Sequence, residues 1–73
     1  MQLETAKTTA LVVNGEQLET DARTLAELIA AGGYGEREVA TALNGEFVPR
    51  AARAGTLLRP GDKIEIVAPR QGG

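Results

Sequence analysis

Two Asn-Gly dipeptides constrain the fold of this chain more than any other feature. The first, Asn14-Gly15, follows residues 9–13, which are rich in β-branched side chains, and precedes residues 16–20, where polar and apolar residues alternate around Leu18. Asn-Gly suits a two-residue turn in which both positions take positive φ, so this pattern predicts a hairpin. The second dipeptide, Asn44-Gly45, leads from residues 39–43 into residues 46–48. Pro49 ends that piece, because proline cannot donate to a strand ladder.

A short helix is expected after the first hairpin. Thr24 stands three residues before Glu27, the capping-box spacing in which each side chain accepts a hydrogen bond from the other's backbone N–H. Gly32-Gly33 then supplies a positive-φ stop, so the helix has about three turns or fewer. Its apolar residues share one face at positions i, i+3 and i+4 and need a sheet to cover: Leu25, Leu28 and Ile29.

The second half of the chain predicts the rest of that sheet. Residues 39–43 form a strand, residues 51–54 a single helical turn, and residues 59–62 a turn with proline and glycine in favoured positions. Residues 63–68 alternate as a final strand, which Pro69 ends. This last strand must fit beside the first, since neither has another long partner. The result is an α+β fold of the β-grasp type, one mixed sheet with the helix across one face.

Alternation assigns a side to each strand residue. We expect seven residues to face the helix: Leu11, Val13, Leu18, Val39, Leu43, Ile64 and Ile66. Four others form an uncovered apolar patch that a partner protein would prefer: Val12, Ala40, Ala42 and Val67. The domain covers residues 9–68, preceded by a polar, disordered arm at 1–8 and followed by a flexible tail at 69–73.

Composition argues against catalysis by this chain. It contains no cysteine, no histidine and no serine, and its only lysines are Lys7 and Lys63. The commonest metal ligand, the usual general base and a thiolate nucleophile are therefore missing. The carboxylates in or beside turns are interpreted as solvated charges, so no metal site is predicted for them: Glu16, Glu19, Glu46 and Asp62.

Charge and hydropathy argue against binding to nucleic acids and against insertion into a membrane. The net charge is −2, with acidic and basic residues mixed along the chain, so the basic stretch that tracks nucleic-acid phosphates is absent from the sequence. Its longest apolar runs are far short of the ~20 residues needed to cross a bilayer. The first nine residues lack the pattern of a secretory signal, so we expect a cytoplasmic protein.

The terminal Gly72-Gly73 has two interpretations. It is either a loose end that happens to finish in glycine, or a reactive tail. A free α-carboxylate is ionised at neutral pH and can attack the α-phosphate of ATP without a base from its own chain. Two glycines add no side chain to a narrow active site, and five extended residues from Pro69 reach at most about 17 Å.

Taken together, residues 9–73 resemble the small sulfur carrier proteins of thiamine thiazole biosynthesis, the ThiS family of the ubiquitin-like β-grasp group. Each matching piece is weak alone, and their order and spacing carry the resemblance. The pieces are Val13-Asn-Gly15, Thr24-Leu-Ala-Glu-Leu28, Val39-Ala-Thr-Ala-Leu-Asn-Gly-Glu46, Val48-Pro-Arg50, Gly61-Asp-Lys-Ile-Glu-Ile66 and the final Gly72-Gly73.

The resemblance implies a carrier that catalyses nothing and binds no cofactor itself. A partner adenylyltransferase of the ThiF type would adenylate the Gly73 carboxylate with ATP and magnesium, and persulfide sulfur would convert it to a thiocarboxylate. A thiazole synthase of the ThiG type would then take up the sulfur. By position, Gly72 is the flexible neighbour of Gly73, and Arg70 and Gln71 contact the walls of the partner's tunnel. By analogy with ubiquitin-like proteins, the uncovered patch would dock the partners.

Two departures from the family pattern and two alternatives remain at this point. The arm before the first strand is longer than the family usually has, and residues 51–54 lack the aromatic residue often found after Val-Pro-Arg. One alternative is the small subunit of molybdopterin synthase, which shares the fold and the thiocarboxylate. The other is a ubiquitin-like interaction module or protein modifier.

Overall fold

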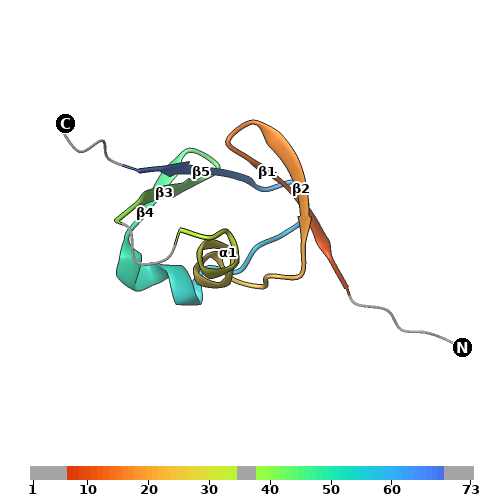
Figure 1. Cartoon of the computed structure of the whole chain (residues 1–73), viewed down its shortest axis with the longest axis horizontal. Helices are drawn as coiled ribbons and strands as arrows, with labels where there is room; N and C mark the ends of the chain where they lie inside the picture. Colours follow the sequence, from red (N-terminus) through yellow and green to blue (C-terminus); the bar gives the residue numbers. More distant parts are fainter. Residues whose placement is uncertain (1–6, 35–37, 69–73) are drawn as a thin grey trace, which may run out of the picture.

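The computed structural model describes residues 7–34 and 38–68, and the β-grasp prediction is confirmed there (Figure 1). A five-stranded mixed sheet has the order β2-β1-β5-β3-β4, with β5 parallel to β1 and antiparallel to β3. The expected pairing of the last strand with the first is therefore present. The elements, in chain order, are β1 (Thr9–Val13), β2 (Glu16–Thr20), α1 (Leu25–Ala31), β3 (Ala40–Leu43), β4 (Glu46–Val48), the 3-10 helix η1 (Arg50–Gly55) and β5 (Lys63–Val67).

Both Asn-Gly dipeptides form the predicted two-residue turns. Asn14 and Gly15 have φ of 51° and 84°, and Asn44 and Gly45 have φ of 51° and 87°. All four values lie in the left-handed region, which asparagine and glycine tolerate best. The first turn joins β1 to β2 and the second joins β3 to β4, each as an antiparallel pair.

The two turn asparagines also bind the central strand. Asn14 Oδ1 accepts a hydrogen bond from Ile66 N at 2.8 Å, and its Nδ2 donates to Ile66 O at 3.2 Å. Asn44 Oδ1 accepts from Lys63 N at 2.9 Å, and its backbone N donates to Lys63 O at 2.7 Å. The Asn14 amide thus continues the pairing with β5 past the end of β1, where the main chain has already turned away.

The helix begins as predicted, with one difference at its cap. Thr24 Oγ1 accepts from Glu27 N at 3.1 Å, but Glu27 Oε1 accepts from Arg23 N at 2.7 Å rather than from the N–H of Thr24. The prediction of a fully reciprocal pair was therefore wrong by one residue, because Glu27 reaches past the cap to the preceding residue. Gly33, with φ of 82°, follows the end of this seven-residue helix.

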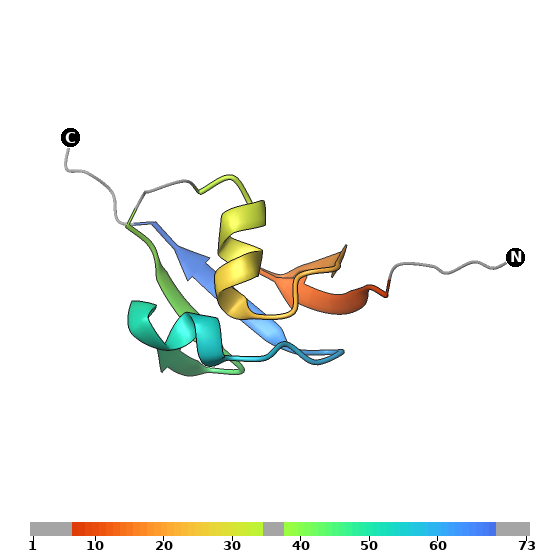
Figure 2. The ribbon, with the colours of Figure 1, turned by 90° about the horizontal axis from the view of Figure 1, so that it is seen from below.

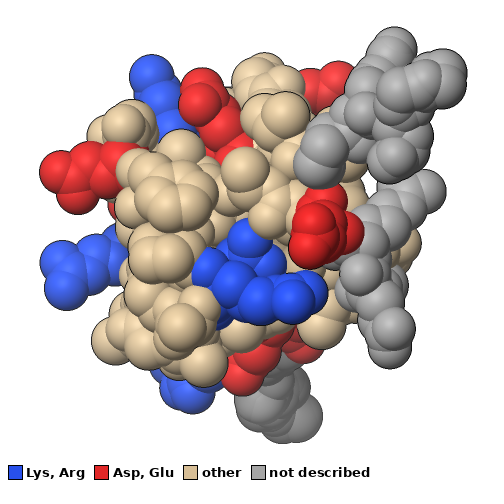
Figure 3. Space-filling view, turned by 90° about the vertical axis from the view of Figure 1, so that its left-hand side faces the viewer, with Lys and Arg blue, Asp and Glu red and all other residues tan. Residues whose placement is uncertain are grey.

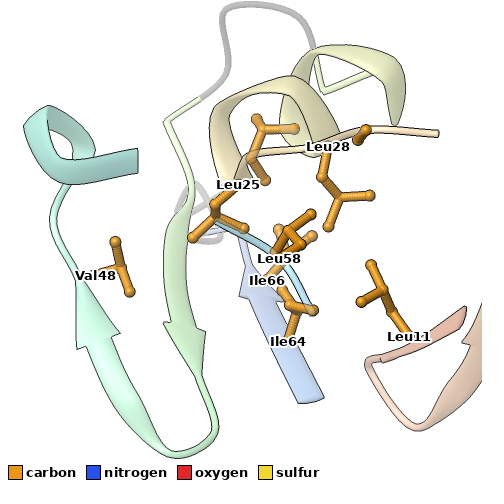
Figure 4. Close-up of a cluster of buried hydrophobic side chains, with 9 residues drawn as sticks. Leu11, Leu25, Leu28, Val48, Leu58, Ile64 and Ile66 are labelled. Carbon is orange, nitrogen blue, oxygen red and sulfur yellow. The ribbon is translucent and has the colours of Figure 1, made fainter. Parts of the chain in front are cut away.

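The buried core lies between α1 and the inner strands (Figure 4). The helical stripe Leu25, Leu28 and Ile29 is buried, as are Leu11, Ile64 and Ile66 of the sheet. Val13, Val39 and Leu43 pack against this cluster and are partly buried, in agreement with their predicted side. The core also includes three residues that the sequence patterns did not single out: Ala22, Val48 and Leu58.

One predicted core residue is exposed. Leu18 is 41% exposed, although it pairs with the buried Leu11 and so shares its side of the sheet. Strand β2 is the edge of the sheet, and α1 packs over the inner strands β1 and β5. The prediction that Leu18 is covered was wrong because alternation gives the side of the sheet but not the width of the helix that covers it.

A buried arginine fastens η1 to the same side of the sheet as α1 (Figure 2). The element runs over Arg50–Gly55, longer than the single turn predicted for residues 51–54. Arg53 is 8% exposed, and its Nε donates to Thr41 Oγ1 at 3.1 Å while its Nη2 donates to Val39 O at 2.6 Å. Thr41, itself 1% exposed, donates onward to Val48 O at 2.8 Å. One hydroxyl therefore links β3, β4 and η1.

Some expectations fall outside the described residues. The predicted arm lies there except for Lys7 and Thr8, and the predicted tail lies there entirely. Among the described segments, none of the helices has the length and apolar character needed to cross a membrane.

The Asn14 side chain is expected to stabilise the fold beyond its role in the turn. Asn14→Gly keeps a residue that accepts positive φ but removes both hydrogen bonds to Ile66, so the free energy of unfolding should fall by about 1–2 kcal/mol. Urea unfolding followed by circular dichroism measures this. Gln17→Ala, an exposed change on β2, should alter stability by less than about 0.5 kcal/mol. Equal stability of Asn14→Gly and the wild type would contradict the prediction.

The Thr41 hydroxyl gives a second stability prediction. Thr41→Val keeps the shape of the side chain but removes the hydroxyl, which accepts a hydrogen bond from Arg53 Nε and donates one to Val48 O. The free energy of unfolding should therefore fall by about 1–3 kcal/mol. The measurement is again urea unfolding. Thr41→Ser keeps the hydroxyl and serves as the control, and it should be more stable than Thr41→Val. A valine variant more stable than the serine variant would show that the hydrogen bonds contribute little.

Candidate partner-binding face

The side of the sheet opposite α1 carries a continuous apolar strip. Ala40 of β3 pairs with Val67 of β5, and Ala42 of β3 pairs with Phe47 of β4. Because paired residues point to the same side of a sheet, these four side chains share one face. Phe47 is 68% exposed and Val67 is 61% exposed. We name Ala40, Ala42, Phe47 and Val67 the open-face patch.

Three of the four residues predicted for docking belong to this patch, and Val12 stands apart from it. Val12 is half-buried and pairs with Lys63 on one side and Gln17 on the other. The alternation of β5 places Lys63 and Glu65 on the same side of the sheet as Val67. The charged side chains of Lys63 and Glu65 therefore lie between Val12 and the patch.

Phe47 is the residue of this face that the sequence reasoning missed. It is the largest exposed apolar side chain of the patch. The signal was available in the second Asn-Gly turn, because a two-residue turn fixes which residues of its strands pair. Counting outward from Asn44-Gly45 pairs Leu43 with Glu46 and Ala42 with Phe47, as the structure shows.

A hollow of about 330 Å³ adjoins the patch beside η1. Figure 3 shows the end of the molecule where β3, β4 and η1 lie, with basic side chains at the centre of the view and acidic ones beside them. The hollow is lined by residues of the strands, of η1 and of the segment before β3: Glu38, Val39, Ala40, Phe47, Arg50 and Arg53.

The patch and the hollow lie where β5 ends. Val67 is the last residue of β5 and pairs with Ala40, which also lines the hollow. The residues predicted to form the reactive tail lie outside the described residues: Arg70, Gln71, Gly72 and Gly73. Within the described ranges, His, Cys, Asp and Glu side chains form no group of three or more that could hold a metal ion. This end of the molecule combines an exposed apolar patch with an adjoining hollow.

Comparisons with known proteins agree with this fold. The sequence profile of the ThiS family matches residues 4–73. The crystal structure of the thiamine biosynthesis protein ThiS from Geobacter metallireducens is 33% identical and superposes with a TM-score of 0.73, covering 89% of this chain and 100% of that one. A thiazole synthase from Paramagnetospirillum magneticum is 41% identical over 59 residues, which cover 80% of this chain and 18% of that protein. The chain thus spans less than a fifth of that relative's length. The family resemblance of the sequence is confirmed, and this chain belongs to the ThiS family.

Proposed function

We propose that this chain is a sulfur carrier for thiamine thiazole synthesis and that the sulfur is carried as a thiocarboxylate at Gly73. Membership of the ThiS family, matched over residues 4–73, is the observation that carries the proposal. The likeness to a solved ThiS protein over its whole length supports it. Both favour the thiazole pathway over a role in molybdopterin synthase.

The chemistry at Gly73 proceeds in three steps. A carboxylate oxygen attacks the α-phosphate of ATP in a ThiF-like adenylyltransferase, which also binds magnesium; pyrophosphate leaves and an acyl-adenylate forms. The terminal sulfur of a persulfide then attacks the acyl carbon and expels AMP, giving an acyl disulfide. A thiol cleaves its S–S bond, so the thiocarboxylate is released and the two other sulfurs form a disulfide.

The chain's own residues act in this scheme by positioning the tail. The open-face patch would dock the adenylyltransferase, and its residue Val67 is the point at which the chain leaves the sheet. Arg70 and Gln71 would then line the approach to the partner's active site, with Gly72 next to the reactive end. In this proposal the partner enzyme supplies both the metal site and the catalytic groups.

The sulfur acceptor in the proposal is a ThiG-like thiazole synthase. The relative named thiazole synthase contains a segment that is 41% identical to this chain over 59 residues. A carrier-like segment within a protein of that name supports a working partnership between the two. The carrier would present its thiocarboxylate to the synthase after leaving the adenylyltransferase.

The central test is intact-mass spectrometry. Incubation with the cognate adenylyltransferase, ATP, magnesium, a persulfide donor and a thiol should replace one oxygen with one sulfur at Gly73. A variant that lacks Gly73 is the control; it should keep the circular dichroism of the wild type and remain unmodified. An unchanged wild-type mass with demonstrably active enzyme would defeat the proposal, and loss of folding in the control would show that the tail supports the core.

A second test concerns docking by the open-face patch. Phe47→Ser should weaken the affinity for the adenylyltransferase by about tenfold or more, because a few aromatic side chains often supply most of the binding energy of an interface. Leu57→Ser is the matched control, since Leu57 is 62% exposed but pairs with Thr24 at the start of α1. Isothermal titration calorimetry measures both variants. If the two substitutions weaken the affinity equally, the open-face patch is not the docking surface.

A further inference from the structure

The hollow beside the open-face patch has more positive than negative charge. Its lining includes Arg50 and Arg53 against the single carboxylate of Glu38, in a chain whose net charge is −2. An apolar docking surface does not require this charge excess. Apolar docking on the patch therefore does not account for the charged walls of the hollow.

Arg53 provides the buried part of that charge. Its side chain is 8% exposed, yet within residues 7–34 and 38–68 its guanidinium hydrogen bonds go to neutral oxygens, those of Thr41 and Val39. A guanidinium has five N–H donors, and these bonds use only Nε and one N–H of Nη2. A buried cation gains most from an anionic partner, and the donors left over can bind a carboxylate with two parallel bonds.

The other walls suit a carboxylate carried on a short apolar stem. Arg50 is exposed at the start of η1, so its side chain can reach the occupant from the solvent side. Two residues of the open-face patch, Phe47 and Ala40, form the apolar wall of the hollow. A volume of about 330 Å³ lies at the small end of the range for ligand pockets, which fits a side chain better than a nucleotide.

We propose that this hollow receives the carboxylate of an aspartate or glutamate that the adenylating partner presents when it docks on the open-face patch. The inference rests on the proposed function, because it names a contact of that partner. Arg53 binds the carboxylate from the buried side and Arg50 from the exposed side. The two arginines also fix the orientation of docking. The hollow is lined by Ala40, and Ala40 pairs with Val67, the residue at which the chain leaves the sheet.

Charge reversal at Arg50 tests the proposal without disturbing the core. Arg50→Glu should weaken the affinity for the adenylyltransferase by about tenfold or more, because it places a like charge against the partner's carboxylate. Arg59→Glu makes the same change in net charge at an exposed arginine of the turn before β5, and it should change the affinity by less than about threefold. Arg50→Lys keeps the charge but loses the planar fork and should lie between the wild type and Arg50→Glu.

Two further readouts separate a specific contact from general steering. Raising the salt concentration should weaken wild-type binding more steeply than Arg50→Glu binding. In nitrogen-15 NMR spectra, the Nε–H signal of Arg53 should shift when the partner is added to the wild type. Unchanged affinity of Arg50→Glu, or equal losses for Arg50→Glu and Arg59→Glu, would overturn the proposal.

The outcome for the hollow is distinguishable from the outcome for the proposed function. Affinity and sulfur transfer are measured separately on the wild type and on Arg50→Glu. A wild type that gains sulfur while Arg50→Glu binds normally overturns only the carboxylate site. A wild type that binds the partner in an Arg50-dependent way but gains no sulfur supports the site and overturns thiocarboxylation. A wild type that does not bind the adenylyltransferase overturns both.

Discussion

The insertion of β5 between the two hairpins is the constraint on which the rest of the structure depends. Each hairpin closes locally through its Asn-Gly turn, but neither forms a sheet large enough to cover α1 until β5 pairs with β1 and β3. The parallel pairing with β1 is short, only Val12 with Lys63 and Val13 with Ile64. The Asn14 amide extends it to Ile66, so the residue that makes the first turn also helps to hold the central strand.

The position of β5 also determines where function can reside. Ile64 and Ile66 point into the core, which leaves Val67 on the open face opposite Ala40, at the point where the strand ends. The Arg53 network fastens η1 beside that point and forms the buried wall of the hollow. The strand that completes the core therefore also brings the chain out next to the exposed apolar and basic groups.

Features set by near neighbours in the sequence were predictable, and so was the pairing of the last strand with the first. The exposure or burial of single side chains that depends on distant parts of the chain was not. The Asn-Gly turns, the Thr24 cap and the alternation of β5 follow from residues within one turn of each other. The predicted burial of Leu18 was wrong because its exposure depends on β2 being an edge strand, and the order of the whole sheet decides which strands lie at its edges. Arg53 could not be foreseen as buried, because its partners Thr41 and Val39 lie 12 and 14 residues away. The position of Phe47 on the open face could have been predicted from the register of the Asn44-Gly45 turn, but that prediction was not made.

The placement of the two lysines is compatible with the proposed activation of Gly73 by a partner enzyme. An acyl-adenylate reacts with amines and thiols. This sequence contains no cysteine, and its only side-chain amines are those of Lys7 and Lys63. Lys63 begins β5, about 13 Å from Val67 at the rise of an extended strand, and Lys7 precedes β1. Because β1 runs parallel to β5, both amines lie at the end of this strand pair opposite the one where the chain leaves the sheet. An activated Gly73 would therefore have to fold back along β5 before either amine could compete with the persulfide.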